Sequence, residues 1–338
     1  MTSASGPARF WKEARESSSF NIAVVLVVLC VVATTFSKYF LDFYNLQSLI
    51  RDLAFLGLIT LGQSILLILG EIDLSLGKIS AFCGVLGGIF MVELGIDPYL
   101  SILLCLAFGF LFGLVNGLLV TQLRLNSLVV TIGMSGVFGG FNLVFTHGEA
   151  ITNIPKSIYF LGQGYLLKVP TPFIIMFAIA ILVIVYARYT KGGRYIYAIG
   201  NSREASLILG IKVNLIKMLA FAFAGLLASV AGILMVARLG TSQPGIGESW
   251  PLNSIAGSVI GGISLTGGVG EPIGALLGIG VIIVIQNMIV LFGVSPYWQT
   301  VVSGVIVVVS IAIGSVSAMV SERNVRRAVT AKTQTEAK

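Results

Sequence analysis

Long runs of apolar residues, almost free of charge, follow one another along most of this chain. A bilayer core of about 30 Å needs about 20 apolar residues of helix to cross it. Runs near that length predict ten membrane segments, at residues 20–36, 53–69, 77–92, 100–120, 128–145, 173–189, 218–237, 252–264, 273–292 and 299–318. We therefore expect an all-α polytopic membrane protein with about ten transmembrane helices.

Two places interrupt this pattern. The run over 53–92 is twice as long as one crossing, so the chain must turn near residues 70–77. Segment 252–264 is short, follows Pro251 and leads into a glycine-rich stretch that ends at residue 268, which predicts a broken or thin helix. Residues 70–77 and 261–268 share four of eight positions, and transporters often carry such internal repeats near broken helices.

Composition places the chain in the membrane class. Of its 338 residues 56% are hydrophobic and only 10% are charged, whereas a soluble protein carries about 25% charged residues. The mean hydropathy of +0.99 agrees. An ordinary soluble enzyme, a disordered protein and a coiled coil are therefore excluded. The 40 glycines suit membrane helices whose backbones approach closely.

Lysines and arginines predict the orientation. With the N-terminus in the cytoplasm, 16 of the 21 basic residues fall on the cytoplasmic side, as the positive-inside rule requires. We expect a bacterial inner-membrane protein with both termini inside: a cytoplasmic N-terminal segment (1–19), a transmembrane region (20–320) with a cytoplasmic loop (190–217), and a cytoplasmic basic tail (321–338). The net charge of +7 reflects this bias, and no nucleic-acid partner is expected.

The sequence contains no catalytic or cofactor motif. It has no Walker Gly-x-x-x-x-Gly-Lys-Ser/Thr stretch, so any ATP hydrolysis belongs to a separate subunit. It has no Ser/His/Asp or His-Glu-x-x-His arrangement, and His147 is the one histidine. Cys30, Cys83 and Cys105 lie in apolar runs, which indicates small buried residues. We expect no catalysis by this chain, and no metal or cofactor bound to it.

The predicted cytoplasmic loop contains a short capped helix between residues 201 and 209. Asn201 or Ser202 can cap its N-terminus, and Glu204 sits favourably in its first turn. Gly210 can end it in the left-handed conformation. One interpretation is a simple surface helix between two spans. The other is a coupling helix that contacts a cytoplasmic motor, since Ala205 and Ser206 are small enough for close docking.

The motif Glu204-Ala205-Ser206-x-x-x-Gly210 resembles the EAA-type loop of ABC importer permeases, with Ser in place of the second Ala. Other stretches, in order along the chain, resemble the ribose/xylose/arabinose-type sugar permeases. They are Ile72-Asp73-Leu74-Ser75-Leu76-Gly77, Val115-Asn116-Gly117-Leu118-Leu119, Gly192-Gly193-Arg194-Tyr195-Ile196-Tyr197-Ala198-Ile199-Gly200-Asn201, Ile260-Gly261-Gly262-Ile263-Ser264-Leu265 and Val294-Ser295-Pro296-Tyr297-Trp298-Gln299.

This resemblance runs from about residue 45 to 318. It implies a permease subunit of an ATP-driven importer for a monosaccharide of ribose, xylose, arabinose or galactose type. The implied partners are a second copy or a paralogue, a cytoplasmic ABC ATPase that binds the ATP, and a periplasmic sugar-binding protein. Residues assigned to ATPase coupling are Asn201, Glu204, Ala205, Ser206, Gly210 and Ile211.

A sugar pathway needs neutral hydrogen-bonding groups along spans that the sugar can leave again. The candidates for the pathway or its gate are Asp73, Ser75, Asn116, Asn253, Gln286 and Asn287. The other interpretation of each is hydrogen bonding between helices, worth about 0.6 kcal/mol. For Asp73 and Ser75 it is capping of the third segment at the cytoplasmic interface. The chain departs from the family pattern at Glu71 and at Pro251-Leu252-Asn253, where the path or gate is expected.

Two features of the outer side complete the expectations. Loop 146–171 is either a docking surface for the binding protein or a mere connection. Trp250 and Trp298 lie at span ends, as aromatic belts do. The functional alternatives are an ABC permease for nucleosides or branched-chain amino acids, an ion-coupled secondary transporter, for which no good charged pair exists, and an intramembrane enzyme.

Overall fold

The computed structural model of the chain describes residues 18–295, 297–309 and 312. Eight helices within these residues are long and apolar enough to cross a membrane. They are α2 (Ser18–Phe36), α3 (Phe43–Ile68), α4 (Leu76–Gly88) with its π-helical continuation η1 (Ile89–Glu93), α5 (Pro98–Gln122), α6 (Ser127–Thr146), α8 (Thr171–Tyr189), α11 (Val213–Leu239) and α13 (Pro272–Leu291). The all-α polytopic fold is confirmed.

Shorter elements connect these spans. They are η2 (Lys156–Ile158), α7 (Tyr159–Gln163), β1 (Tyr165–Leu166), β2 (Val169–Pro170), α9 (Lys191–Asn201), α10 (Arg203–Ile208) and α12 (Trp250–Ile260). A further apolar helix covers Tyr297–Val309 and overlaps the first part of the predicted tenth segment (299–318). The rest of that segment, most of the predicted N-terminal segment and the whole basic tail lie outside the described residues.

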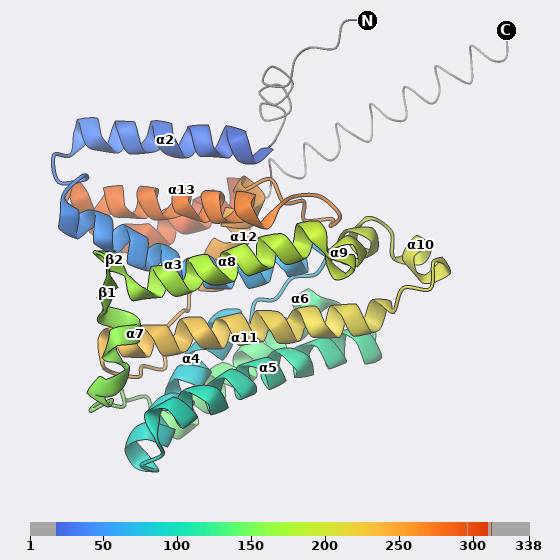
Figure 1. Cartoon of the computed structure of the whole chain (residues 1–338), viewed down its shortest axis with the longest axis horizontal. Helices are drawn as coiled ribbons and strands as arrows, with labels where there is room; N and C mark the ends of the chain where they lie inside the picture. Colours follow the sequence, from blue (N-terminus) through green and yellow to red (C-terminus); the bar gives the residue numbers. More distant parts are fainter. Residues whose placement is uncertain (1–17, 296, 310–311, 313–338) are drawn as a thin grey trace, which may run out of the picture.

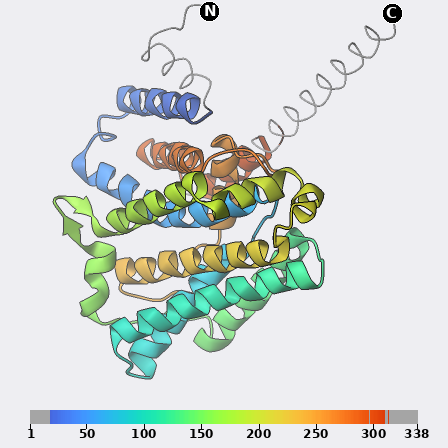
Figure 2. The same cartoon turned by 45° about the vertical axis from the view of Figure 1, so that its right-hand side comes forward.

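The spans lie side by side with α12 packed between them, and the other connecting elements gather at the two ends of the bundle (Figures 1 and 2). The antiparallel β1–β2 hairpin and α7 form one end, called here the hairpin end. Helices α9 and α10 form the opposite end, called the α9 end. Ser19, at the start of α2, also lies at the α9 end, because its Oγ donates to Glu271 Oε2 just before α13.

Helix α11 forms the centre of the bundle and packs against α3, α4 and α5. Glycine allows the closest of these approaches, since a Cβ atom at Gly113 of α5 would overlap the Phe221 carbonyl oxygen and lie 2.9 Å from Ala222 Cα. The most apolar window of α3 is 78% buried, whereas that of α2 is 11% buried. The outer helices thus present apolar side chains outward, as a bilayer requires.

An extended segment over residues 70–75 interrupts the crossing between α3 and α4. Its Ile72 N–H donates to Ser127 Oγ at 3.3 Å, and its Leu74 N–H donates to Thr131 Oγ1 at 3.1 Å. The segment therefore runs beside α6 for about one helical turn, from Ser127 to Thr131. Backbone that is neither helix nor closed sheet needs such partners inside a membrane protein. Helix α4 consequently begins inside the bundle and not at its edge.

A second interruption precedes α12. Residues 240–249 leave α11 at the hairpin end, where Ser242 pairs with Ile151, and turn inward. At Gly247 they reach the start of α4, where a Cβ atom on Gly77 would overlap the Gly247 carbonyl oxygen. The short helix predicted at 252–264 is confirmed as α12, but this irregular segment before it is an element that the hydropathy pattern does not predict.

The two interrupted crossings thus enter the bundle from opposite ends and meet near Gly77 and Gly247. From that meeting point α4 runs to the hairpin end, and α12 runs to the α9 end. The turns that carry the sequence repeat also touch: Gly268 N–H donates to Ile68 O at 2.8 Å, and Gly70 packs against Gly267.

Candidate functional site

Three of the predicted pathway residues form one closed, buried cluster. Asp73 is 0% exposed, and its Oδ1 accepts hydrogen bonds from Ser75 N at 2.7 Å and Ser75 Oγ at 2.6 Å. Asn116 of α5 donates from Nδ2 to Asp73 Oδ2 at 3.2 Å and to Ser75 Oγ at 2.7 Å. This cluster ties the extended segment to α5 and holds the start of α4.

The structure places Asp73 and Ser75 inside the bundle, beside the first turn of α6, and their predicted position at the membrane interface stays a prediction. The chain does turn at the end of α3, but it then re-enters the bundle and carries both residues inward. Ser75 precedes α4 without a side-chain capping bond. The Asp73 carboxylate satisfies the Ser75 N–H instead. Lys78, counted with the cytoplasmic residues, lies inside the first turn of α4, where it pairs with Glu248 at 3.1 Å.

Glu71, one of the two departures from the family pattern, lies at the α9 end and pairs with Lys217 in the second turn of α11. The two side chains are only 10% and 15% exposed. Partial burial strengthens such a pair compared with one in bulk water. The pair fixes the turn after α3 to the start of α11.

The other three predicted pathway residues, Asn253, Gln286 and Asn287, line a cavity of about 370 Å³. This volume lies at the lower end of the range for small-molecule sites. The sequence did not indicate Asn45 and Asp52, which α3 contributes. The full lining is Asn45, Ser48, Leu49, Asp52, Phe55, Leu56, Met235, Ser249, Trp250, Asn253, Ile283, Gln286, Asn287, Val290 and Gln299.

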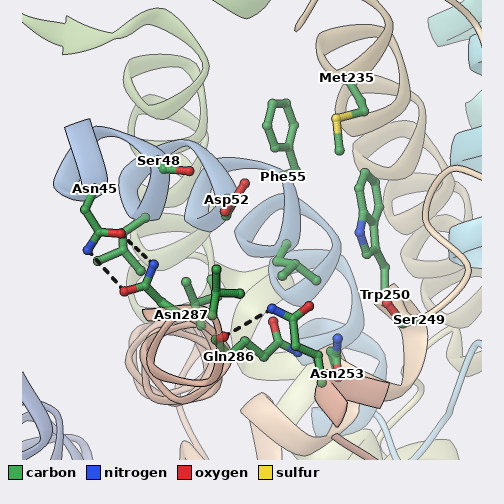
Figure 3. A pocket seen from close by; sticks show the side chains of 15 residues that line it. Asn45, Ser48, Asp52, Phe55, Met235, Ser249, Trp250, Asn253, Gln286 and Asn287 are labelled. Atoms are coloured by element: carbon green, nitrogen blue, oxygen red, sulfur yellow. Dashed lines mark hydrogen bonds between the residues drawn. The ribbon is translucent and has the colours of Figure 1, made fainter. Parts of the chain in front are cut away.

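The polar side chains of the cavity differ in whether their hydrogen-bonding atoms have partners within the protein. Asn45 and Asn287 bond each other reciprocally, at 3.1 and 2.7 Å (Figure 3). Gln286 Nε2 donates to Ser303 Oγ at 2.9 Å. Asn253 is 3% exposed, and its Oδ1 has no hydrogen-bond partner among the described residues. Asn253 therefore brings to this cavity a buried acceptor that no group in the described residues occupies.

Apolar and charged side chains form the rest of the wall. Trp250 stacks on Phe55, with ring centroids 6.4 Å apart and an interplanar angle of 10°. Asp52 accepts from Arg238 Nη1 at 2.7 Å, and the Arg238 guanidinium lies 5.4 Å from the Phe55 ring centroid. The expected place of Trp250 in an aromatic belt is wrong, because the inward segment 240–249 carries it into the bundle, where it is 8% exposed.

Helix α10 protrudes from the α9 end (Figure 1). Its predicted cap is confirmed: Ser202 Oγ accepts from Ala205 N at 3.2 Å, and Gly210 has a φ of +75° beyond its last turn. Ser206 is 1% exposed and donates to Ser202 O. It therefore faces the chain, and its expected contribution to a docking surface is wrong.

The exposed apolar surface of α10 begins directly after Ser206. Leu207, Ile208 and Leu209 are 51%, 87% and 76% exposed. Asn201, Glu204 and Ala205 are exposed as well, whereas Ile211 is partly buried and packs on the main core. An exposed apolar tip outside the bundle is typical of a contact with another protein. We call residues 207–209 the α10 tip.

Helix α9, which the sequence did not predict, links this tip to the bundle. Thr190 caps it by accepting from Gly193 N at 3.0 Å, and Ile196 and Ile199 are buried. Tyr197 donates its O–H to Gly270 O at 2.9 Å. Burial, with a smaller contribution from Glu271, raises the pKa of Tyr197.

The last turn of α9 lies directly on the two turns described above. A Cβ atom at Gly200 would overlap the Ile68 carbonyl oxygen and lie 2.5 Å from Gly268 N. On the other side, a Cβ atom at Gly268 would lie 2.9 Å from Asn201 Cα. The backbones of α9, of the turn after α3 and of the turn after α12 thus touch without intervening side chains. A displacement of α9 would move both turns.

The predicted outer loop 146–171 is an ordered structure at the hairpin end. Gly162 of α7 packs on the backbone of Arg238, and Gln163 Nε2 donates to Arg238 O at 3.0 Å. Leu167 and Lys168 form the hairpin turn with φ angles of +51° and +67°. Leu167 is 93% exposed. Within the described residues, no group of three or more His, Cys, Asp or Glu side chains could hold a metal ion.

Comparison with known proteins identifies the family of this chain. Residues 45–311 match the model of a family described as branched-chain amino acid transport system / permease component. The chain is 37% identical to the ribose import permease protein RbsC of Bacillus subtilis (strain 168), over 85% of this chain and 89% of the relative. No solved structure matches it.

Two further relatives are named for other substrates. The autoinducer 2 import system permease protein LsrC of Enterobacter sp. (strain 638) is 33% identical, over 86% of this chain and 84% of the relative. The xylose transport system permease protein XylH of Haemophilus influenzae (strain ATCC 51907 / DSM 11121 / KW20 / Rd) is 27% identical, over 88% and 96%. The similarity to each covers nearly the whole transmembrane bundle.

Proposed function

This chain belongs to the branched-chain amino acid transport system permease family, and from that premise we propose that it is the membrane subunit of an ATP-driven ABC importer for a monosaccharide. The sugar assignment rests on the relatives named for ribose and xylose import, and on the neutral amides that line the cavity. A periplasmic binding protein delivers the sugar, and a separate ATPase supplies the energy. A second copy of the chain or a paralogue completes the bundle.

The observation that carries this proposal is the connection from the α10 tip to the interior. The tip is an exposed apolar surface for the ATPase, and α9 joins it to the two glycine turns. In this proposal the α9 end faces the cytoplasm, and the hairpin end faces the binding protein. The position of Ser19 at the α9 end supports an N-terminus on the same side as the tip.

Reconstitution tests the proposal. The chain is placed in proteoliposomes with a candidate ATPase and binding protein, and uptake of D-ribose, D-xylose and leucine is measured with and without ATP. We expect uptake of a pentose that depends on ATP and on the binding protein. Uptake of leucine alone would support the substrate in the family description instead. Uptake driven by an ion gradient without the ATPase would contradict the importer mechanism.

A negative charge introduced at the α10 tip is expected to prevent the ATPase from binding. In an Ile208→Asp variant the carboxylate would have to be buried in the apolar contact, since Ile208 is 87% exposed in the free chain. We expect at least a tenfold loss of ATPase co-purification, an order-of-magnitude figure for one buried charge, and a matching loss of uptake. The melting temperature of the permease in detergent should stay unchanged, because Ile208 makes little contact within the chain.

The hairpin end offers a matched control. Leu167 is 93% exposed, so Leu167→Asp is the same kind of change at the other end of the bundle. We expect this variant to retain the ATPase and to lose stimulation by the binding protein. If Leu167→Asp released the ATPase while Ile208→Asp retained it, the proposed orientation would be reversed.

A further inference from the structure

The cavity beside α12 has the features of a small-molecule site within the permease. It runs from partly exposed residues at the hairpin end, Asn45 and Gln299, to a buried floor at Asn253 and Trp250. Its volume of about 370 Å³ accommodates a monosaccharide, and its wall combines aromatic rings with a few polar groups. In the orientation proposed above, it faces the side from which the sugar arrives.

Asn253 supplies the first argument for a ligand. Buried side-chain amides are normally hydrogen-bonded, yet Asn253 Oδ1 has no partner in the described part of the chain. It sits in the first turn of α12, where its own N–H already donates to Ser249 O and its buried side-chain oxygen is left without a described partner. Asn45 and Asn287, by contrast, pair their amides with each other. A hydroxyl group of a ligand would satisfy Asn253.

The aromatic wall supplies the second argument. Figure 3 shows Phe55, Trp250 and Met235 on one side of the cavity, across from the amides of Gln286 and Asn287. The Phe55 ring fixes the Trp250 indole by stacking on it. An aromatic face opposite neutral amides suits a ring with one apolar C–H face and hydroxyl groups at its edge, which is the chemistry of a sugar.

The charges in the wall are already paired. Asp52 accepts from Arg238 at 2.7 Å, so the cavity offers no isolated charge to hold an ion. A neutral polyol can still donate a hydroxyl to the Asp52 carboxylate, whose side chain is 45% exposed. A zwitterionic amino acid would have to compete with this pair for both of its charged groups.

We propose that this cavity is a weak binding station for the transported monosaccharide, with Trp250 against the sugar ring and Asn253 and Asp52 bonded to its hydroxyls. The inference rests on the proposed sugar specificity and adds to it that the permease itself holds the sugar. A transport site must bind its solute weakly enough to release it. We expect half-saturation in the millimolar range, on the order of 1 mM.

Tryptophan fluorescence of the purified chain in lipid nanodiscs, without ATPase or binding protein, tests this station. The variant Trp11→Phe/Trp298→Phe leaves Trp250 as the reporter. Titration with D-ribose and D-xylose should give a saturable change, while leucine should give none. In this background Asn253→Ala should raise the half-saturating concentration about fivefold, as loss of one ordinary hydrogen bond does.

Asn142 provides the matched control. It is 1% exposed, its amide has no partner among the described residues, and it lies on α6, outside the cavity. Asn142→Ala should leave the sugar titration unchanged. The absence of a saturable sugar response, or equal effects of the two alanine variants, would overturn the station while ATP-driven pentose uptake still upheld the proposed function. A response to leucine alone would overturn the sugar assignment of both.

Discussion

Replacing Gly200 with valine is expected to abolish ATP-driven uptake while leaving the ATPase attached. The new Cβ would overlap the Ile68 carbonyl oxygen and lie 2.5 Å from Gly268 N, so α9 must separate from one or both turns. Forcing atoms into a packed site of this kind costs about 1–3 kcal/mol. The α10 tip is not altered, and hydrolysis therefore continues without transport. We expect uptake to fall at least about tenfold, with ATPase co-purification unchanged.

Gly136 on α6 is the matched control for this substitution. A Cβ atom there meets nothing within 4 Å, so Gly136→Val makes the same chemical change in a helix without a clash. Uptake per inserted molecule and ATP hydrolysis are measured for both variants in the same proteoliposomes. Normal, tightly coupled uptake by Gly200→Val would show that force does not pass from α9 to the turns.

Removal of the Asp73 carboxylate is expected to destabilise the bundle more than any other single change discussed here. In Asp73→Ala the Ser75 N–H and O–H lose their acceptor in a site that is 0% exposed, and the Asn116 amide keeps only its bond to Ser75 Oγ. Each buried donor left unpaired costs about 1–3 kcal/mol. We expect the protein to melt at a markedly lower temperature in detergent and to be poorly recovered from membranes.

The conservative variant separates hydrogen bonding from charge. Asp73→Asn keeps an oxygen that can accept from Ser75 N, and Asn116 has an unpaired Oδ1 that its rotated amide can turn toward the new amide group. We expect a loss of about 1 kcal/mol, a fraction of the alanine effect. If Asp73→Ala had the same melting temperature as the unmodified chain, the structural importance of this cluster would be contradicted.

The sequence predicted the features that depend on neighbouring residues only, such as the cap and the end of α10. Ser202 and Gly210 act within a few residues of their own positions, and both the cap and the left-handed residue are present. Helix α9 escaped prediction because its start, Lys191-Gly192-Gly193, has poor helix propensity. Tertiary contacts stabilise it, through buried Ile196 and Ile199.

The re-entrant backbone could not be predicted, for a different reason. Hydropathy reports that residues 53–92 are apolar, but it does not distinguish helix from extended chain within that run. The partners that make the extended segment possible, Ser127 and Thr131, lie more than 50 positions further along the chain. Only the folded bundle brings them together.

The candidate cavity was predicted in part. Asn253, Gln286 and Asn287 stood out as polar residues in apolar runs, and all three line it. Trp250 did not, because its position at the end of a predicted span indicated an interface, and nothing in the pattern singled out Asp52. The inward segment before α12 and the pairing with Arg238 place both in the wall.

The backbone contact between Gly77 and Gly247 has a consequence for how such a protein can work. From this contact, which would be the pivot of any tilt between the two helices, α4 with its continuation η1 extends toward the hairpin end and the shorter α12 extends toward the α9 end. A tilt about this pivot would swing the far ends of the two helices in opposite senses, so that one entrance widens as the other narrows. Solute could then cross without a continuous pore ever opening, and the membrane potential would be preserved during each cycle.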